Sequence, residues 1–241
     1  MLSIVIPAYN EADTIGATVA EIAAQFERAG REYEILVVDD ASSDATEATL
    51  DELEKRFPRL RHVSNPGPNG YGYAVRTGLR HFRGDAVVIA MADASDSPAD
   101  MLAYGERIGQ GFDCAFGSRF VPGAHVEDYP PVKRVLNRLG NRLIALLLRQ
   151  RYYDFSNGFK CYRREVIEGM EPLVSGEFNL TVEMSMKALL NGASFAVVPN
   201  DWRNRSAGGS KFHITAQGIP YLLSILYCLI EQRLKRPRRR A

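Results

Sequence analysis

The first 117 residues alternate between short apolar runs and amphipathic helical segments, and this alternation limits the folds open to the chain. The apolar runs lie at residues 2–6, 34–38, 60–63, 86–91 and 113–117. Between them, apolar residues recur at helical spacing, as Ile15, Val19 and Phe26 do after the first run. Strands that alternate with helices form a parallel sheet covered on both faces. We therefore expect an α/β fold with a mostly parallel, Rossmann-like sheet.

Polar residues follow three of these runs at the point where each strand should end. Asn10-Glu11 follows the first run, Asp39-Asp40 the second, and Asp93 and Asp96 the fourth. Ligands bind just beyond the carboxyl ends of strands in such sheets. Mg²⁺ is usually held by one or two carboxylates plus substrate phosphates, so Asp93 and Asp96 predict a metal–diphosphate site. The alternative is a capped strand-to-helix turn, because Asp and Ser are common N-cap residues.

Composition sets wider limits. The 241 residues are 46% hydrophobic and 24% charged with a net charge of +1, which is typical of a globular protein and says little about partners. Cys114, Cys161 and Cys228 are scattered through apolar runs without metal-binding spacing, which indicates buried thiols in a reducing compartment. The N-terminus shows no signal-peptide pattern, so we expect a cytoplasmic protein.

A basic amphipathic helix is expected at residues 132–148. Its apolar residues are Val135, Leu136, Leu139, Leu143, Leu146 and Leu147. The basic residues along and just after it are Lys133, Arg134, Arg138, Arg142 and Arg149. Such a helix can lie at a membrane surface. It can equally pack its apolar face on the core and leave the arginines in solvent, and the sequence leaves both alternatives open.

Two later segments carry positive charge. Residues 202–211 form a Gly/Ser-rich loop whose Arg and Lys residues suit phosphate oxygens. Residues 219–230 are apolar and precede a basic block at 233–240. Twelve residues cannot span a bilayer, which needs ~20, but they suit an interfacial anchor on anionic lipid. Nucleic-acid binding would leave the apolar run unexplained, so we expect no nucleic-acid partner. The predicted organisation is a catalytic domain at 1–213, with a nucleotide-binding half at 1–117 and an acceptor-binding half at 118–213, followed by a membrane-associating segment at 214–241.

Several motifs together resemble a known family. Pro7-Ala8-Tyr9-Asn10-Glu11, Val37-Val38-Asp39-Asp40-Ala41-Ser42-Ser43-Asp44 and the acidic turn at 93–96 resemble glycosyltransferase family 2, which has the GT-A fold. Later motifs are similar to its dolichyl-phosphate mannosyltransferase branch: Gly117-Ser118-Arg119-Phe120, Asp154 with Asn157-Gly158-Phe159-Lys160, Glu183, and Arg205-Ser206-Ala207-Gly208-Gly209-Ser210-Lys211. The likeness covers nearly the whole chain.

The resemblance implies roles for particular residues. The donor nucleotide would be bound by Pro7, Tyr9, Glu11 and either Asp39 or Asp40. The acceptor phosphate would be bound by Arg119 and by Lys133 or Arg138. The catalytic residues would be Asp93 and Asp96, which hold Mg²⁺ or Mn²⁺, and Arg205 and Lys211, which grip phosphates from the opposite side.

The acidic turn departs from the branch pattern. The branch usually shows Asp-Ala-Asp followed by a polar residue two positions on, and those positions here are Ala92, Ala94 and Asp96. Either the turn is rebuilt so that Asp93 and Asp96 share the metal, or metal binding is weakened. We favour the first, because a turn without a metal role would not need both acids.

The reaction implied is inverting, metal-dependent transfer of a sugar from a GDP-mannose-like or UDP-sugar donor to a polyprenyl or dolichyl phosphate at the inner face of the membrane. A phosphate monoester is already anionic at pH 7, because its second pKa is ~6, so it needs cations more than a base. A saccharide acceptor would need a base, for which Asp128, Asp154 and Glu183 remain. A catalytically silent nucleotide-sugar-binding membrane protein is a further alternative. A sugar-nucleotide pyrophosphorylase is disfavoured, because the loop after the first strand lacks the Gly-rich basic pattern.

Overall fold

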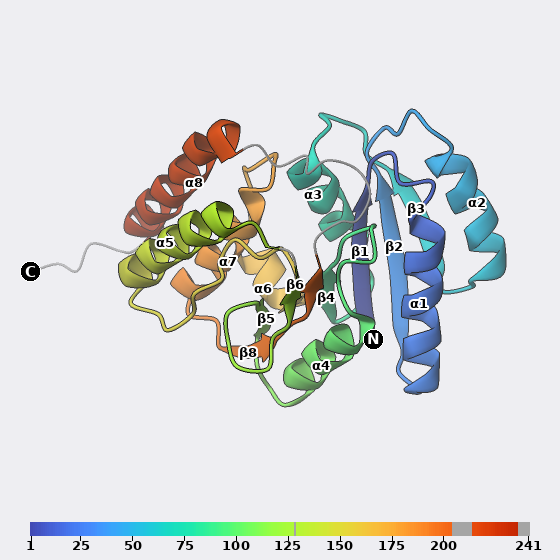
Figure 1. Ribbon diagram of the computed structural model, residues 1–241, viewed down its shortest axis with the longest axis horizontal. Helices are drawn as coiled ribbons and strands as arrows, with labels where there is room; N and C mark the ends of the chain where they lie inside the picture. The colour runs from blue at the N-terminus through green and yellow to red at the C-terminus, as the bar shows by residue number, and fades with distance from the viewer. Residues whose placement is uncertain (128, 204–213, 236–241) are drawn as a thin grey trace, which may run out of the picture.

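The computed structural model describes residues 1–127, 129–203 and 214–235 (Figure 1). The strands are β1 (Leu2–Ala8), β2 (Tyr33–Asp39), β3 (Leu60–Ser64), β4 (Ala86–Ile89), β5 (Cys114–Ser118), β6 (Val126–Glu127), β7 (Lys160–Arg163), β8 (Phe195–Pro199) and β9 (Trp202–Arg203). The helices are α1 (Ile15–Arg28), α2 (Thr46–Arg56), α3 (Tyr71–His81), α4 (Pro98–Gly109), α5 (Pro131–Leu148), α6 (Arg164–Gly169), α7 (Leu180–Leu190) and α8 (Ile214–Lys235). The first five strands agree with the predicted apolar runs to within two residues at each end.

Seven of these strands form one sheet in the order β3-β2-β1-β4-β7-β5-β8. All neighbours pair in parallel except β7, which runs antiparallel to both β4 and β5. The predicted mostly parallel sheet is therefore confirmed. Strand β7 enters the sheet from the second half of the chain and separates β4 from β5, so both halves contribute to one sheet. Strands β6 and β9 form a separate small pair.

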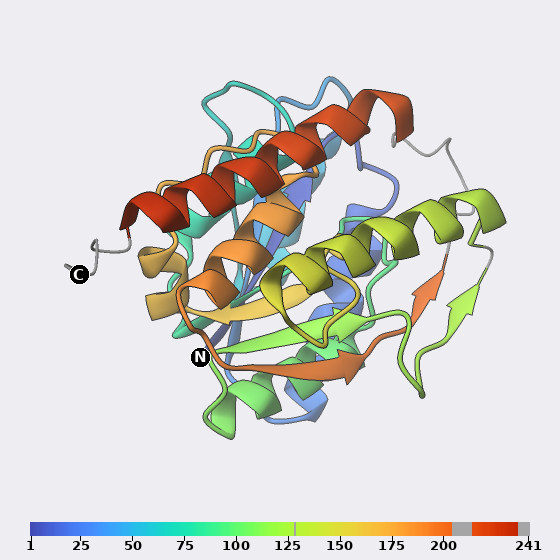
Figure 2. The ribbon, with the colours of Figure 1, turned by 90° about the vertical axis from the view of Figure 1, so that its left-hand side faces the viewer.

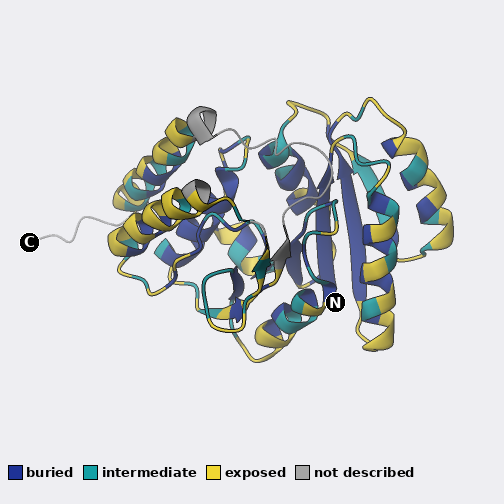
Figure 3. Cartoon of the chain, viewed as in Figure 1, coloured by how far each residue is buried: buried dark blue, intermediate teal, exposed yellow. Residues whose placement is uncertain are grey.

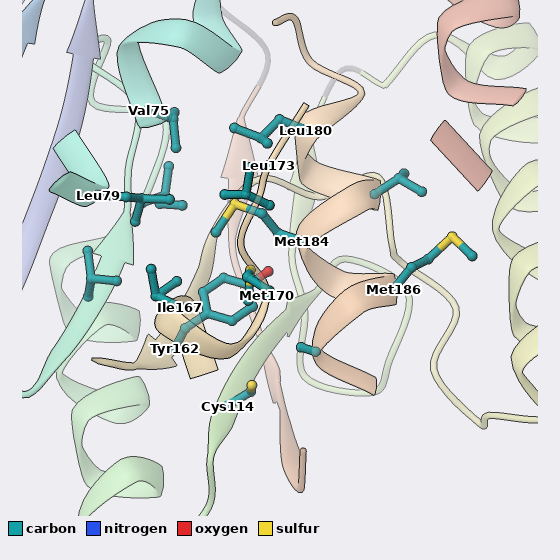
Figure 4. Packing of buried hydrophobic residues seen from close by; sticks show 14 of the residues in the cluster. Val75, Leu79, Cys114, Tyr162, Ile167, Met170, Leu173, Leu180, Met184 and Met186 are labelled. Carbon is teal, nitrogen blue, oxygen red and sulfur yellow. The ribbon is translucent and has the colours of Figure 1, made fainter. Parts of the chain in front are cut away.

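The core follows the two-residue repeat of the strands. In β1, Ile4 and Ile6 pack on the face that α1, α2 and α4 cover, whereas Val5 packs on the opposite face. Helices α3, α6 and α7 cover that second face (Figure 1). Figure 4 shows side chains of α3, such as Val75, meeting Met184 of α7 across it. Each such side chain stabilises the fold by roughly 1.5–3 kcal/mol when fully buried.

Helix α3 lies unusually close to the sheet at Gly78. A Cβ atom added there would clash with the side chain of Val5 in β1 and lie 3.2 Å from Cγ2 of Val38 in β2. The glycine therefore lets the helix axis approach the strands. This close contact packs the last turn of α3 on β1 and β2, and the helix begins just after the 65–70 loop.

Helices α5 and α8 lie on one side of the molecule, outside α7 (Figures 1 and 2). Figure 3 shows many exposed residues in both helices, and several of these residues are large and apolar. The exposed ones are Val135, Leu136, Leu139, Leu143, Leu146 and Leu147 in α5, and Ile219, Leu222, Leu223, Leu226, Ile230 and Leu234 in α8. The core-packing alternative therefore does not hold for these six apolar residues of α5, whereas Ile144 and Ala145 of the same helix do pack on the core. No helix in the described part of the chain is both long and apolar enough to cross a membrane.

Candidate active site

Strands β1, β2 and β4 end together at one edge of the sheet. The register places Ala8 beside Asp39, and the backbone N–H of Asp40 donates to Ala8 O at 2.8 Å. Just past each strand the backbone turns through a left-handed residue: Asn10 has φ 54°, Ala41 has φ 58° and Ala94 has φ 56°. This conformation costs an alanine roughly 1–2 kcal/mol, and such strain persists where the surroundings impose it, often at functional sites.

The loops after β1 and β2 are hydrogen-bonded to each other. The backbone N–H of Asn10 donates to Ser42 Oγ at 2.9 Å, and Asn10 Oδ1 accepts from the N–H of Ser43 at 2.8 Å. The N–H of Glu11 donates to Thr46 Oγ1 at 2.9 Å. The hydroxyl residues of the second loop therefore fix the shape of both loops before any ligand arrives.

The predicted donor residues of β1 lie at this edge. Pro7 is buried within the strand, whereas Tyr9 is exposed in the loop and Glu11 is half-buried. Glu11 Oε2 accepts a hydrogen bond from Thr14 Oγ1 at 2.8 Å, which orients the carboxylate at the start of α1. The structure thus brings Pro7, Tyr9 and Glu11 together beside the end of β2.

Asp39 and Asp40 differ in what they bind. Both oxygens of Asp40 are engaged: Oδ1 accepts from Asn65 Nδ2 at 2.6 Å and Oδ2 from the N–H of Gly70 at 2.7 Å. Asp39 is also buried, but its Oδ1 has no hydrogen-bond partner among the described residues. A buried polar atom without a partner costs about 1–3 kcal/mol, and a ligand can remove this cost. Asp39 is therefore the donor-binding candidate, and Asp40 holds the 65–70 loop.

The acidic turn after β4 is held by hydrogen bonds within the turn and by one from α1. Asp96 Oδ2 accepts from the N–H of Met91 at 2.9 Å, and Asp93 Oδ1 accepts from the N–H of Ser95 at 3.2 Å. The hydroxyl of Thr18 in α1 donates to Ala92 O at 2.8 Å. Ser97 is the N-cap residue of α4, and no side-chain hydrogen bond caps that helix. The helix-cap alternative therefore does not account for the two acids.

Burial changes the protonation of Asp96. It raises the pKa of this carboxyl to about 7, against the opposing effect of the Met91 N–H, and the charge of Asp93 adds to the rise. The positive charge of Arg119 opposes it. A nearby cation would stabilise the ionised form in the same way as Arg119 does. The carboxyl is therefore costly to ionise without a cation and well suited to meet one.

The donor set fits a hard divalent cation of the Mg²⁺ or Mn²⁺ kind. Two carboxylates lie in one turn, and one of them is buried with a raised pKa. Within the described residues, no cluster of three or more His, Cys, Asp or Glu side chains could hold a metal ion. Ligation by one or two carboxylates with substrate phosphates completing the shell is the usual arrangement for Mg²⁺. Asp93 and Asp96 would hold the ion in that arrangement.

Arg119 follows β5 and makes a buried ion pair with Asp154. Its Nε donates to Asp154 Oδ2 at 3.0 Å and its Nη2 to Oδ1 at 2.6 Å, and the Asp154 side chain is fully buried. Burial alone would lower the pKa of the guanidinium, but Asp154 outweighs this and raises it. Such two-point pairing fixes the plane of the guanidinium. Arg119 is therefore a charged group whose orientation is set by Asp154.

Arg138 of α5 joins this positive cluster. Both guanidinium groups lie near the ring of Phe120: its centroid is 5.6 Å from Cζ of Arg119 and 5.4 Å from Cζ of Arg138. The structure therefore brings together two of the predicted acceptor residues. The side chain of Lys133 lies outside the described residues, as do Arg205 and Lys211.

Two carboxylates considered as bases have structural roles instead. Asp154 is paired with Arg119, as above. Glu183 is fully buried, and its oxygens accept from the N–H groups of Val174 and Ser175 at 2.9 and 2.8 Å. Lys187 lies 3.3 Å from Glu183 Oε1. Asp128 lies outside the described residues.

Some structural residues of the site were not predicted. Tyr71, the first residue of α3, is one of them: its ring stacks on that of Phe178 with the centroids 4.3 Å apart, and a tyrosine after a glycine-rich loop gives no signal of this contact. Lys160 is another: its buried ammonium donates to Phe155 O at 2.7 Å and to Asn157 O, and burial lowers its pKa to about 7. The carbonyl of Gly176 accepts the N–H of Gly72 at 2.8 Å. The glycines of the 65–72 loop thus admit another part of the chain.

A mostly parallel sheet with one inserted antiparallel strand, and an acidic turn that follows β4, are features of the GT-A-type glycosyltransferases. Residues 3–170 match the model of Glycosyl transferase family 2, and the chain belongs to that family.

Among curated relatives, the chain is 33% identical over 216 residues to a polyprenol monophosphomannose synthase of Mycolicibacterium smegmatis, which covers 86% of this chain and 79% of that protein. It is 30% identical over 197 residues to a dolichol-phosphate mannosyltransferase of Pyrococcus furiosus, covering 76% of this chain and 55% of that protein. The chain therefore spans about half the length of the Pyrococcus relative.

Solved structures agree on the fold. A glucosyl-3-phosphoglycerate synthase of Mycobacterium tuberculosis in complex with Mn²⁺, uridine diphosphate and phosphoglyceric acid superposes with a TM-score of 0.70 at 18% identity, covering 96% of this chain and 78% of that one. The same enzyme in complex with Mg²⁺ and uridine diphosphate has a TM-score of 0.69 at 18% identity, covering 96% of this chain and 79% of that one. At this identity the likeness supports the GT-A fold alone.

Proposed function

We propose that this glycosyltransferase transfers a sugar, with inversion at the anomeric carbon, from a nucleotide-diphosphate sugar to the phosphate of a polyprenyl phosphate at a membrane surface. The observation that carries the proposal is the pair of guanidinium groups around Phe120, those of Arg119 and Arg138, with Arg119 held in place by Asp154. These cations are suited to a phosphate acceptor, and the acidic turn after β4 is suited to a metal–diphosphate group.

On the donor side, the chain's residues bind and orient the nucleotide. Asp39 Oδ1 accepts a hydrogen bond from the base or ribose, and the cross-linked loops after β1 and β2 hold Tyr9 and Glu11 around it. When bound at Asp93 and Asp96, Mg²⁺ or Mn²⁺ supplies positive charge for the departing diphosphate. Arg205 and Lys211 are proposed to neutralise that charge from the opposite side.

On the acceptor side, cations position a nucleophile that needs no base. A phosphate monoester is largely dianionic at neutral pH, since its second pKa is ~6. Arg119, fixed by Asp154, and Arg138 would orient its oxygens, with Lys133 as a further candidate. Asp154 and Glu183 are both committed to protein partners. This commitment favours a phosphate acceptor over a saccharide hydroxyl, which would require a base.

The relatives support the same acceptor and suggest the donor. Two of them carry names that specify transfer of mannose to polyprenol or dolichol phosphate. Mannose from a GDP donor is therefore the first combination to test, and a UDP-sugar is the second.

The outward apolar faces of α5 and α8 support a membrane surface as the site of the reaction. Among the exposed residues of α5, Arg134, Arg138 and Arg142 accompany the leucines. Apolar residues beside basic ones suit the anionic inner leaflet, where each basic residue adds roughly 1 kcal/mol. We propose peripheral association with the cytoplasmic face through this α5/α8 surface, with the basic residues after Lys235 adding to it.

The test is transfer of labelled sugar in vesicles that contain polyprenyl phosphate. GDP-mannose and UDP-sugars are compared as donors, each with Mn²⁺, with Mg²⁺ and with a chelator, and the anomeric configuration of the product is read by NMR. We expect metal-dependent, inverting transfer to polyprenyl phosphate and none to the unphosphorylated polyprenol. Equal transfer to free saccharides, or nucleotide binding without any transfer, would contradict the proposal and favour the saccharide or the silent alternative.

A further inference from the structure

Lys160, the first residue of β7, has an ammonium group that lies inside the protein. The residue is 1% exposed, and its Nζ lies 5.7 Å from the ring centroid of Phe116 and 5.8 Å from that of Tyr152. It makes no ion pair with a carboxylate of the described residues. A buried charge is costly unless it is paired or hydrogen-bonded. The hydrogen bonds of this ammonium are therefore the part of its surroundings that offsets its burial.

The ammonium of Lys160 binds two carbonyls of one turn, residues 154–157. Its Nζ donates to Phe155 O at 2.7 Å and also to Asn157 O. No other hydrogen bond to either carbonyl is found among the described residues. A buried carbonyl without a partner is unfavourable, so the shape of the turn depends on this one side chain.

The same turn carries Asp154, the partner of Arg119. In addition to the two side-chain bonds described above, Asp154 Oδ2 accepts the backbone N–H of Arg119 at 2.9 Å. Asp154 directly precedes Phe155, so a displaced Phe155 carbonyl would move the carboxylate. At the other end of the turn, Asn157 Nδ2 donates to Gly117 O at 3.1 Å, in the strand that leads to Arg119. The position of the turn therefore sets the position of the guanidinium.

We propose that Lys160 is a positioning residue for the acceptor site: it fixes the turn that carries Asp154 and thereby the orientation of Arg119. This inference rests on the proposed function for the role of Arg119 in binding the acceptor phosphate. Lys160 itself makes no contact with the phosphate, because its ammonium is buried and engaged with the two carbonyls.

The positioning role does not depend on the charge of Lys160. Burial lowers the pKa of its ammonium to about 7; the charge of Asp154 opposes this shift, that of Arg119 adds to it, and Cys114 opposes it more weakly. A neutral amine still has an N–H for each carbonyl, so loss of the proton leaves the turn in place. The affinity for the acceptor should therefore not follow the titration of Lys160.

Three variants test the proposal. Lys160→Met removes both the donors and the charge, whereas Lys160→Gln keeps N–H donors without the charge. Arg164→Met is the matched control, because Arg164 follows the other end of β7 and also holds a turn by its carbonyls. It donates to Phe82 O at 3.1 Å and to Gly84 O at 2.7 Å. This control removes the same kind of contact away from the acceptor site.

The link to Arg119 is measured first, without any substrate. Hydrogen exchange of the Arg119 backbone N–H, followed by NMR, reports its bond to Asp154. In Lys160→Met this exchange should be about tenfold faster, because two hydrogen bonds of the turn are lost. The N–H of Gly70, which is bound to Asp40 at the donor edge, should exchange as in the wild type. Unchanged exchange at Arg119, or an equal acceleration at Gly70, would overturn the proposal.

The transfer assay then separates positioning from general stability. In Lys160→Met the KM for polyprenyl phosphate should rise by about tenfold, with the KM for the nucleotide sugar within about twofold of wild type. Lys160→Gln should recover most of this loss, and Arg164→Met should keep both wild-type values. An equal rise of the two KM values, or the same loss in Arg164→Met, would overturn the proposal and assign Lys160 to the stability of the fold.

The pH dependence separates positioning from charge. Between pH 7 and 9 the acceptor phosphate stays dianionic, since its second pKa is ~6. The KM for polyprenyl phosphate should change with pH equally in the wild type and in Lys160→Gln. A rise in the wild type that Lys160→Gln lacks would show that the ammonium attracts the phosphate by its charge, and would overturn the positioning role. If Arg119 exchange responds to Lys160→Met but the wild type transfers nothing to polyprenyl phosphate, the proposed function fails while this inference stands.

Discussion

Polar and apolar side chains are arranged in opposite ways at the edge of the sheet where β1, β2 and β4 end and on the α5/α8 surface. At the edge, apolar side chains of β1 and β2 point into the core, and polar side chains of the loops bind one another. In α5 and α8, polar residues such as Asn141 and Ser224 face the body of the protein, whereas leucines face outward. The first arrangement fixes the shape of the polar loops. The second leaves apolar area available for another surface.

Both helices are attached to the body of the protein by a few buried apolar residues, such as Ile144 and Ile225, and by polar contacts. Asn141 Nδ2 donates to Ser156 Oγ at 3.1 Å, next to the Asn157-Gly158 turn. In α8, Gln232 Nε2 donates to Leu190 O at 2.8 Å, and Glu231 lies 3.0 Å from Lys187 Nζ. Variants at the edge should therefore change donor binding and catalysis, whereas variants on the outer face should change membrane binding. The predictions below test this separation.

The largest effect is expected for Asp96→Asn. Loss of a charge that holds the metal–diphosphate group should lower kcat by roughly 10²–10³-fold, as for other groups that stabilise transition-state charge. The affinity for vesicles should stay within about twofold of wild type, since these surfaces are separate. The exposed Asp51→Asn on α2 is the control. A comparable loss in Asp93→Asn would show that the two acids share the metal, whereas a loss of vesicle binding in either variant would break the separation.

The neighbours Asp39 and Asp40 should respond differently to the same change. Asp39→Asn removes the charge of a buried acceptor proposed to face the nucleotide, so the donor KM should rise on the order of 50-fold with little change in melting temperature. Asp40→Asn replaces an acceptor for the Gly70 N–H by a group that cannot satisfy both partners, so the melting temperature should fall by about 3 °C or more. Identical profiles for the two variants would contradict the distinction.

On the outer face, Leu139→Ser with Leu143→Ser should weaken vesicle binding by roughly 30-fold, at about 1 kcal/mol for each half-exposed leucine. These side chains are 56% and 50% exposed, so the melting temperature should not fall. Ile144→Ser on the buried side of the same helix should lower the melting temperature and leave the vesicle affinity of the folded protein intact. Unchanged vesicle co-sedimentation of the double variant would remove α5 from the membrane surface.

A smaller effect is expected where the two regions meet, at Arg138. Arg138→Gln should raise the KM for polyprenyl phosphate by about fivefold, because one charge-assisted contact is lost. Arg142→Gln, one turn further along α5, controls for the general charge of the helix. Arg119 is a poor probe, because its removal strands the buried Asp154 at a cost of about 3–5 kcal/mol. Equal effects of the two glutamines would indicate charge attraction to the membrane instead of a phosphate contact.

Sequence patterns predicted the strands and the strand-end acids well, because both depend on local composition. The apolar stripe of α5 was also visible, but periodicity does not say on which side of a helix the rest of the protein lies. The side of the helix that faces the protein carries Asn137 and Asn141, and their hydrogen bonds to Ser156 form only in the folded chain. The same holds for Asp39 and Asp40, which look alike in sequence and differ only through Asn65 and Gly70.

Long-range partners account for the remaining differences. The pairing of Arg119 with Asp154 joins residues 35 positions apart, and nothing near either one predicts the other. The insertion of β7 between β4 and β5 likewise depends on contacts between residues that are far apart in the sequence. A sequence can therefore predict which residues gather at an edge of the sheet, but not which of them are already bound to other residues of the protein.

The smallest predicted effect is a difference in how pH changes the stability through Asp96 at one edge of the sheet and through Asp113 at the other. Burial raises the pKa of Asp96 to about 7, whereas hydrogen bonds from the Ser194 side chain and N–H lower the pKa of Asp113 at the start of β5. A raised native pKa gives stability that is present below the unfolded value of about 3.9 and is lost as the pH rises through 7. Without metal, Asp96→Asn should therefore have the same melting temperature as wild type at pH 4 and a melting temperature roughly a few degrees higher than wild type at pH 8.

Asp113→Asn should show the opposite sign. A lowered native pKa contributes stability above the unfolded value, and this is lost only as the pH falls through the native pKa. The variant should therefore melt below wild type at pH 8 and approach it in acid. Adding Mn²⁺ with nucleotide should stabilise wild type and Asp113→Asn but not Asp96→Asn, because a ligand raises stability only where it binds the native state. Melting temperatures measured by calorimetry at pH 4, 6 and 8 test both predictions. If metal-free Asp96→Asn melts below wild type at pH 8, the protein itself already stabilises the ionised carboxylate of Asp96.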